Sequence, residues 1–411
     1  MNLSDTETPT LHTATITDQQ EKWSGDASIP LEALVIRNPR KGEIMKISAA
    51  VARNHGQPLT VEELELDEPR HNEVRVRMVA SGICHTDAVV RDGIYPTPLP
   101  AVLGHEGSGI VEAIGDSVTS VVPGDHVVLA AAYCGHCKRC RNGQMAYCEN
   151  LFAADFGGRR NDGSTALKDK DGETISSHFF GQSSFGTFAN VVEESVVKVG
   201  KDLPLEHLGP LGCGFNTGAG TVLNELQPEI GSTLVVFGAG AVGSAAIMAA
   251  RVAHCAKVVA IDIHDDRLNL AKELGATHVI NSLNEDIDQR LNEITDGNGV
   301  DYVVDTTARP ELLRAAADSL GVRGTVALVG AAKPGTEATF EVGGSLVKGW
   351  TFKTVVQGSS VPQVFIPRMI QLWRDGLFPF EKLIADYSLD QINQGFEDSK
   401  SGKVVKPVVI Y

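Results

Sequence analysis

The sequence lacks any run of about 20 consecutive apolar residues, the length that a membrane-spanning helix requires. It also opens without the apolar core of a signal peptide. Acidic residues outnumber basic ones by 52 to 36, and the net charge of −16 argues against a nucleic-acid-binding surface. The seven cysteines are an odd number, which disfavours a disulfide framework. We therefore expect a cytoplasmic protein whose cysteines are metal ligands or catalytic groups.

The length of 411 residues predicts two domains, or three, and the hydrophobic share of 42% is that of an ordinary folded protein. Residues 1–44 differ from the rest because they are rich in Thr, Ser, Asp and Gln. This composition predicts a poorly ordered extension, with Met45 as a candidate natural start. A transit peptide is the alternative, but such peptides are rich in Arg and poor in acidic residues, whereas acidic residues outnumber basic ones here.

From Met45 the pattern is that of a β-rich domain. The alternation of apolar and polar residues predicts half-buried strands at 47–51, 59–66, 73–79 and 108–114. Repeated Gly, Asp and Ser predict a loop over 149–186, and 187–199 returns to strand. The final segment, from about residue 357, is predicted to hold one helix (362–375) and a terminal strand (404–411).

Beyond residue 214 strands and helices alternate. Ser232–Phe237 is a continuous apolar run, typical of a strand buried on both faces of a parallel sheet. Strands are predicted at 232–237, 257–261, 277–280, 301–304 and 324–329, and helices at 241–253, 265–274, 285–296 and 310–319. This alternation predicts an α/β fold with a doubly wound parallel sheet.

Four cysteines stand as C-x2-C-x2-C-x7-C: Cys134, Cys137, Cys140 and Cys148. Closely spaced thiolates suit a tetrahedral zinc ion, and four of them leave no open position, so the predicted zinc is structural. The alternatives are four unrelated thiols, a zinc-ribbon docking or nucleic-acid module, and a [4Fe–4S] cluster, whose common spacings differ from this one.

Three further residues form a second candidate metal site. Cys84 lies in GICHTD, His105 in GHEG and Cys213 in GCG, each at a glycine-rich turn. One His and two Cys make the three-ligand set of a catalytic zinc with an open fourth position. Buried thiols and a hydrogen-bonded loop histidine are the alternative on spacing alone. Cys255, in an Ala-rich stretch, is predicted to be an inert core residue.

The segment GAGAVG follows a predicted strand and opens a predicted helix, with the three glycines at Gly238, Gly240 and Gly243. Asp262 follows at the end of the next strand, which completes a dinucleotide-binding fingerprint. The glycines allow the turn, the approach of the pyrophosphate and the packing of helix on strand. Asp262 would accept hydrogen bonds from ribose hydroxyls and repel a 2′-phosphate, which favours NAD over NADP. Arg267 is a second candidate contact to this ribose.

In this order, GICHTD, GHEG, the four-cysteine lobe, GCG and GAGAVG followed by Asp262 resemble the zinc-dependent medium-chain alcohol dehydrogenases. The resemblance covers about residues 45–411, and within the family it is greatest to the bacterial aryl-alcohol (benzyl alcohol) dehydrogenases. It implies a GroES-like catalytic domain at 45–215, completed by 357–411, and a Rossmann NAD-binding domain at 216–356. It also implies a homo-oligomer, dimer or tetramer, for which edge strands around 338–356 are a candidate contact.

The resemblance assigns roles to individual residues of the candidate site. Cys84, His105 and Cys213 become ligands of a catalytic zinc, Glu106 lies behind the zinc, and Asp87 orients the histidine. Thr86 takes the proton of the alcohol and passes it to the nicotinamide ribose. The resemblance places cofactor contacts at His85 and Lys406, toward the phosphates, and at Thr217 and Val242, beside the nicotinamide. Many relatives carry a proton-relay histidine where this chain has Val89, so the proton must leave by water or another base.

The leading hypothesis is a zinc- and NAD-dependent enzyme that oxidises primary aromatic or allylic alcohols to aldehydes. Small residues at 130–132 suggest room for a bulky ring. The alternatives keep the chemistry on another alcohol: geraniol-like, short aliphatic, or S-hydroxymethylglutathione. A non-catalytic NAD-sensing protein is an alternative of another class, against which the intact Cys84, His105, Cys213 and Thr86 argue.

Overall fold

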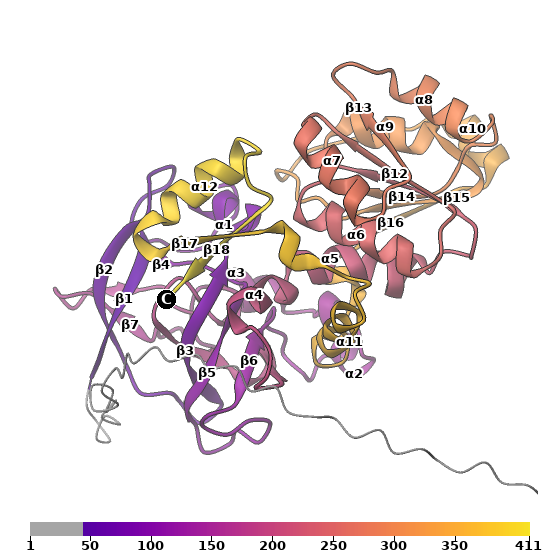
Figure 1. The fold of residues 1–411 in the computed structure, drawn as a ribbon. Helices are drawn as coiled ribbons and strands as arrows, with labels where there is room; N and C mark the ends of the chain where they lie inside the picture. Colours follow the sequence, from indigo (N-terminus) through magenta and orange to yellow (C-terminus); the bar gives the residue numbers. More distant parts are fainter. Residues whose placement is uncertain (1–43) are drawn as a thin grey trace, which may run out of the picture. The chain divides into compact units, whose positions relative to one another are not determined.

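The computed structural model describes residues 44–411 of the chain (Figure 1). The extension predicted at 1–44 therefore lies outside the described residues, except for its last residue. Within the described part, none of the helices combines the length and apolarity needed to cross a lipid bilayer. Three β-sheets and the helices packed on them make up this part of the chain.

Two of the sheets come mainly from the first half of the chain. One has the order β4-β1-β2-β7-β8, and the other has the order β10-β6-β5-β3-β18-β17, with β9 paired to β3. Their strands are β1 (Met45–Ala52), β2 (Thr60–Leu66), β3 (Glu73–Gly82), β4 (Ala101–Val102), β5 (Gly107–Ile114), β6 (His126–Leu129), β7 (Leu167–Lys168), β8 (Thr174–Ile175), β9 (Phe188–Val192), β10 (Val196–Val199), β17 (Ile384–Ser388) and β18 (Lys406–Ile410).

The end of the chain returns to the first half. Strand β18 pairs antiparallel with β3, and β17 pairs parallel with β18, so yellow strands lie beside the much earlier β3 in Figure 1. The terminal strand was predicted from the sequence, but β17 was not. Because β17 is partly exposed and short, its apolar pattern is weak, and pairing with β18 determines its conformation.

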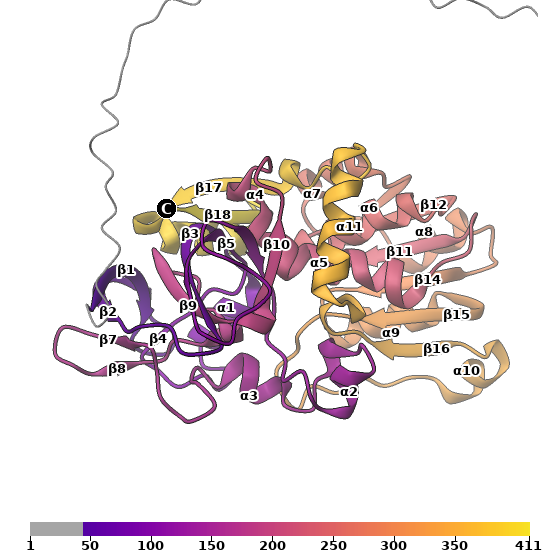
Figure 2. The same ribbon diagram turned by 90° about the horizontal axis from the view of Figure 1, so that it is seen from below.

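The third sheet is parallel throughout and has the order β13-β12-β11-β14-β15-β16. Its strands are β11 (Thr233–Phe237), β12 (Lys257–Asp262), β13 (His278–Asn281), β14 (Val300–Asp305), β15 (Leu320–Leu328) and β16 (Thr351–Thr354), several of which run side by side in Figure 2. The order reverses between β11 and β14, the point at which doubly wound sheets bind nucleotides. The predicted doubly wound parallel sheet is confirmed.

The helices of residues 44–411 follow the sequence patterns where those are long and periodic. They are α1 (His85–Arg91), α2 (Lys138–Arg141), α3 (Leu151–Phe156), α4 (Leu205–Leu208), α5 (Gly214–Gly220), α6 (Ala241–Val252), α7 (Asp265–Leu274), α8 (Ile287–Ile294), α9 (Pro310–Asp318), α10 (Val342–Lys348), α11 (Pro362–Arg374) and α12 (Ile392–Lys400). All four helices predicted between 241 and 319 are present. Alanine-rich α6 is almost wholly buried, as a helix against a parallel sheet should be.

Three predictions of local structure were wrong. The segment 149–186, predicted as a loop, contains α3, β7 and β8, and most of residues 175–186 are buried. The final segment holds two long helices, α11 and α12, where one was predicted. The predicted edge strands around 338–356 reduce to β16 preceded by α10, a glycine-containing helix that the Glu341 side chain caps at Gly343 and Gly344.

Candidate metal centres and cofactor site

Cys84, His105 and Cys213 converge from three turns. Cys84 precedes α1, His105 lies between β4 and β5, and Cys213 precedes α5. One ligand atom from each of these residues and a carboxylate oxygen of Glu106 all lie within 4.8 Å of one another. His105 and Glu106 are fully buried and Cys213 is nearly so. The fold therefore brings together residues that are far apart in the sequence, in the set predicted for a catalytic zinc.

The ring nitrogens of His105 have different surroundings. Nδ1 lies 2.9 Å from Oδ1 of Asp87, which also accepts the backbone N–H of Gly104 at 3.1 Å. Oδ2 of Asp87 accepts the N–H of Cys84 at 2.9 Å. Nε2 is buried and has no hydrogen-bond partner among the described residues. A buried nitrogen left free beside two thiols and held by a carboxylate on its other side fits a metal ligand.

The surroundings of Cys84 favour its thiolate, the form that binds metals. A hydrogen bond from Cys213 lowers its pKa well below the ordinary value, burial acts in the opposite direction, and the charge of His105 adds to the lowering. A thiolate is the form in which cysteine coordinates zinc. The donor set of one nitrogen and two sulfurs therefore fits zinc, with Glu106 close enough to take part.

Lys406 and Glu106 form a buried ion pair behind this cluster. The ammonium donates to both carboxylate oxygens, at 3.0 and 2.8 Å, and to the carbonyl of Ile83 at 3.1 Å. Burial lowers the pKa of Lys406, but the carboxylate of Glu106 outweighs burial and the net shift is upward. In this structure the three N–H groups of Lys406 are directed to these acceptors, and the predicted phosphate contact of Lys406 stays a prediction.

Two phenylalanine rings contact His105, and a third packs against both of them. Phe180 stacks on the imidazole, with ring centroids 4.4 Å apart, and Phe179 meets it edge-on at 5.5 Å. Phe156 of α3 packs against both phenylalanines, at 6.0 and 5.1 Å. Phe180 adopts a left-handed backbone conformation, with φ of 51°, that brings its ring to the imidazole. These rings were not predicted from the sequence; the paired Phe in a segment rich in Ser and Gly was the signal available.

The other residues predicted around the reacting centre lie on the helices that start there. Oγ1 of Thr86 lies 3.9 Å from Sγ of Cys84, whereas His85, on the same helix, is exposed. Val89 is buried and carries no titratable group. Thr217 on α5 is buried and Val242 on α6 is half-buried, and these two helices pack together.

The four-cysteine lobe forms a second cluster. The ligand atoms of Cys134, Cys137, Cys140 and Cys148 lie within 4.8 Å of one another. Backbone N–H groups donate to three of these sulfurs at 3.4 Å, as they do to thiolates in metal sites. Burial raises the pKa of Cys134, but the N–H groups of His136 and Cys137 outweigh it and bring the pKa to about 6. This sulfur-only set fits a structural zinc.

The glycine-rich turn links β11 to α6. Gly238 has φ of +88°, a conformation that side chains disfavour, and a Cβ on Gly243 would lie 1.8 Å from the carbonyl oxygen of Gly238. Beside Gly240, at the start of α6, a Cβ would meet nothing within 4 Å. The turn therefore leaves open space at a helix N-terminus, where a pyrophosphate would be favoured.

Asp262 ends β12 and faces the same turn. Its oxygens accept backbone N–H groups of Ala239 at 2.8 Å, Ile263 at 2.7 Å and His264 at 3.0 Å. Arg267 lies nearby, with Nη1 3.9 Å from Oδ2 of Asp262 and Nη2 donating to the carbonyl of Ser399 at 3.4 Å. The carboxylate is thus fixed in the place where the fingerprint predicts contact with a ribose.

Two titratable groups, one buried and one partly buried, were outside or peripheral to the predicted site. Burial raises the pKa of Asp155, which precedes Phe156, to about 8, and its Oδ1 accepts the N–H of Ala132 at 3.0 Å. Burial also raises the pKa of Cys255 to about 11, which keeps this thiol protonated and unreactive near neutral pH. Cys255 packs against the core as expected from the sequence.

Two family sequence patterns match the chain. Residues 70–201 match the pattern described as "Alcohol dehydrogenase GroES-like domain", and residues 241–374 match "Zinc-binding dehydrogenase". The first range holds the four-cysteine lobe and two residues of the Cys84–His105–Cys213 cluster. The second holds most of the parallel sheet with Asp262.

Similar proteins extend over nearly the whole described chain. Geraniol dehydrogenase of Castellaniella defragrans is 43% identical over 371 residues, 90% of this chain and 99% of the relative. The structure of benzyl alcohol dehydrogenase from Acinetobacter calcoaceticus is 47% identical, with a TM-score of 0.86 over 89% of this chain and 99% of that one. An alcohol dehydrogenase zinc-binding domain protein from Burkholderia ambifaria is 51% identical, with a TM-score of 0.88 over 90% and 99%.

Proposed function

The chain belongs to the zinc-dependent alcohol dehydrogenases, and we propose that it transfers hydride between a primary aromatic or allylic alcohol and NAD, giving the aldehyde. The observation that carries the choice of substrate is the aromatic enclosure of His105 by Phe179 and Phe180. These buried rings make the surroundings of the catalytic residues apolar, which favours an apolar, unsaturated alcohol over a short or charged one. Geraniol and benzyl alcohol, named for two relatives, are both unsaturated.

Small residues directly after β6 support the same choice of substrate. Ala130 and Ala132 are buried and Ala131 is partly buried, directly after β6. Side chains of this size do not extend far from the backbone, so a ring can approach it closely. Together with the phenylalanines, the three alanines support a substrate that is wide and apolar rather than short or charged.

Zinc held by Cys84, His105 and Cys213 would act as a Lewis acid that lowers the pKa of an alcohol hydroxyl. In this proposal, residues of the protein transfer the proton and orient the histidine ligand. Thr86 is placed next to Cys84 to take the proton of the alcohol and pass it toward the cofactor. Asp87 holds His105 in one orientation throughout the reaction. Because position 89 is Val, the proton leaves through water or another base.

The cofactors of the family are zinc and a nicotinamide dinucleotide, and we assign NAD to this chain. Gly238, Gly240 and Gly243 would form the phosphate turn, with Asp262 and Arg267 at the ribose. The Asp262 carboxylate would repel the 2′-phosphate of NADP at short range. His85, exposed at the start of α1, and Thr217 with Val242 complete the proposed cofactor contacts.

The test is reduction of NAD by the purified zinc-loaded protein with a panel of benzyl, allylic, short aliphatic and sugar alcohols, followed by NADH absorbance. We expect the greatest kcat/KM for the benzyl or allylic alcohols. A preference for short aliphatic alcohols, or for S-hydroxymethylglutathione, would contradict the substrate assignment and leave the reaction class intact. No turnover of any alcohol, with two zinc ions bound per chain, would favour an NAD-sensing role.

We also propose that the protein is cytoplasmic and forms a homo-oligomer, either a dimer or a tetramer. The edge of the parallel sheet ends at β16, and the neighbouring α10 exposes Val342, Leu346 and Val347, which are 78%, 82% and 85% accessible. A second copy covering this face would remove three large apolar side chains from water. Analytical ultracentrifugation of the wild type and a Leu346→Glu variant tests this: the variant should dissociate, and a wild-type monomer would refute the proposal.

A further inference from the structure

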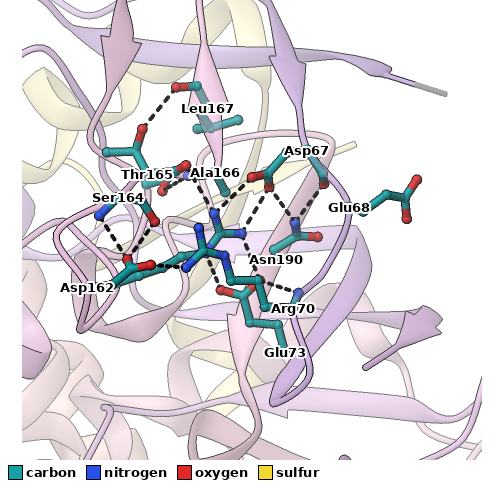
Figure 3. A network of polar contacts seen from close by, with 12 residues as sticks. Asp67, Glu68, Arg70, Glu73, Asp162, Ser164, Thr165, Ala166, Leu167 and Asn190 are labelled. Carbon is teal, nitrogen blue, oxygen red and sulfur yellow. Dashed lines mark hydrogen bonds and ion pairs between the residues drawn. The ribbon is translucent and has the colours of Figure 1, made fainter. Parts of the chain in front are cut away.

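A buried ion pair lies away from both cysteine clusters. The guanidinium of Arg160 donates to both oxygens of Glu73, at 2.6 and 2.8 Å, and both residues are at most 9% exposed. Its remaining N–H groups bind Asp67, at 2.9 Å twice, and the carbonyl of Thr165 at 3.1 Å. All five donors of the guanidinium are therefore used, and Figure 3 shows Asp67, Glu73 and Thr165 in this network.

A histidine binds the same carboxylate. Nε2 of His178 lies 2.9 Å from Oε1 of Glu73, and Nδ1 lies 2.8 Å from Oγ of Ser177. That hydroxyl also accepts the N–H of Ala166 at 2.8 Å, which fixes it. His178 is 2% exposed, so its ring is held by hydrogen bonds at both nitrogens inside the protein.

Arg160 and His178 each adjoin a segment that carries the aromatic rings around His105. His178 directly precedes Phe179 and Phe180, and Arg160 follows closely on Phe156. The two segments are also joined by the N–H of Ser177, which donates to the carbonyl of Gly158 at 3.1 Å. The carboxylate of Glu73 thus ties together the two stretches of chain from which the rings project.

We propose that Glu73 and Arg160 are positioning residues for the reaction: by holding His178 and the loop after Phe156, they fix the phenylalanine rings against His105 and so set the shape of the substrate site. The inference rests on the function proposed above, because it identifies the residues that determine the selectivity for wide, unsaturated alcohols. Neither residue touches the metal cluster. Both act through Phe156, Phe179 and Phe180.

Open space borders this region on one side. A cavity of about 580 Å³ borders Glu73, Arg160 and His178, and Gly181 lines it directly after Phe180. Space on that side would allow the segment to move away from the metal cluster if the ion pair were absent. Phe180 also has a left-handed backbone, which is unfavourable in a residue other than glycine and persists only when its surroundings impose it. Hydrogen bonding to Glu73 is one such constraint.

The experiment compares Arg160→Met and Glu73→Gln with the wild type. Arg70→Met is the matched control, because Arg70 pairs through its side chain with Asp162, and both side chains of that pair are about half exposed. For each variant we would measure kcat and KM for benzyl alcohol and for ethanol. We expect KM for benzyl alcohol to rise roughly tenfold or more in the two test variants, with kcat and the ethanol constants much less affected. The control should match the wild type.

A second measurement does not depend on turnover. With cobalt replacing zinc at Cys84, His105 and Cys213, the visible absorption bands report the geometry around the metal, and displaced rings should shift them in Arg160→Met but not in Arg70→Met. A variant that melts like the wild type and keeps both its benzyl-to-ethanol ratio and its cobalt spectrum would overturn the proposal. If Arg160→Met does not fold, Glu73→Gln decides the question, because its amide oxygen can still accept two of the four hydrogen bonds made by the carboxylate. If the wild type oxidises no alcohol, the proposed function fails, and the cobalt spectrum still tests the positioning.

Discussion

Nδ1 of His105 lies 2.9 Å from Oδ1 of Asp87, and neither side chain is exposed to solvent. The carboxylate can only accept in this hydrogen bond, so Nδ1 carries the proton and Nε2 is left with its lone pair directed away from Asp87. That lone pair is the one a zinc ion requires. The orientation of the catalytic cluster thus depends on a residue that does not belong to it.

Replacing this carboxylate tests its role. In Asp87→Asn the amide can present N–H groups to Nδ1, which favours the tautomer with a proton on Nε2 and opposes metal binding. We expect zinc affinity or kcat/KM to fall by about 10–100-fold. Zinc content after dialysis against a chelator reports the zinc affinity, and steady-state kinetics report kcat/KM. Asp92→Asn, at the exposed end of the same helix, is the control and should behave like the wild type.

The buried pair of Lys406 and Glu106 gives a prediction about stability. Lys406→Met removes the ammonium and leaves Glu106 buried with the N–H of Gly214 as its remaining hydrogen-bond donor. An uncompensated buried charge costs about 3–5 kcal/mol, so the free energy of unfolding in urea should fall by that order. The double variant Lys406→Met with Glu106→Gln should recover part of the loss. If the single and double variants lost the same free energy of unfolding, the buried charge of Glu106 would not be the cause of the loss.

The sequence predicts those parts of the fold that depend on long local patterns. The apolar run at β11, the glycine turn at Gly238 and the periodicity of α6 and α7 each specify their own structure, and the doubly wound sheet follows from their order. Short elements were missed, because β7 and β8 have two residues each: β7 forms by pairing with the distant β2, and β8 by pairing with β7. Helix α12 was missed although it begins after a capping box at Ser388.

The candidate site also has residues that the sequence predicts and residues that it does not. Cys84, His105 and Cys213 were found because each lies in a short, recognisable motif, and their convergence in space follows from the pairing of strands that the motifs flank. The resemblance predicts a phosphate contact for Lys406, but it does not predict the buried ion pair that Lys406 forms with Glu106. The network of Arg160 and Glu73 has no local signature, since its members are scattered from residue 67 to residue 190.

The pKa of Glu73 predicts how stability depends on pH. Burial raises this pKa, but hydrogen bonds from His178 and Arg160 outweigh burial and hold it well below its ordinary value of 4.5. The contribution of Glu73 to stability is therefore complete above about pH 4.5 and declines as the pH falls toward the pKa of the folded state. In thermal melts, the difference between wild type and Glu73→Gln should shrink from about pH 5 to about pH 3. A constant difference over this range would contradict the shift.

The choice of cofactor depends on Asp262. In Asp262→Asn the negative charge that opposes a 2′-phosphate is lost, while the side-chain oxygen can still accept backbone N–H groups such as that of Ala239. We expect the ratio of kcat/KM for NAD to that for NADP to fall by roughly tenfold, about 1.4 kcal/mol. Kinetics with both cofactors measure this. Asp265→Asn on α7 is the control, and an equal change in both variants would assign the effect to net charge.

The four-cysteine lobe should bind its zinc independently of the catalytic cluster. Cys137→Ser removes one of four sulfurs, and its backbone neighbours still position Cys134, Cys140 and Cys148. Because a structural zinc site contributes to folding directly, the variant should contain one zinc per chain instead of two and should melt at a lower temperature. Metal analysis and calorimetry check both. Cys255→Ser is the matched control, since this thiol lies in neither cluster and should leave two zinc ions bound. If Cys137→Ser still bound two zinc ions per chain, the lobe would not depend on all four cysteines to hold its zinc.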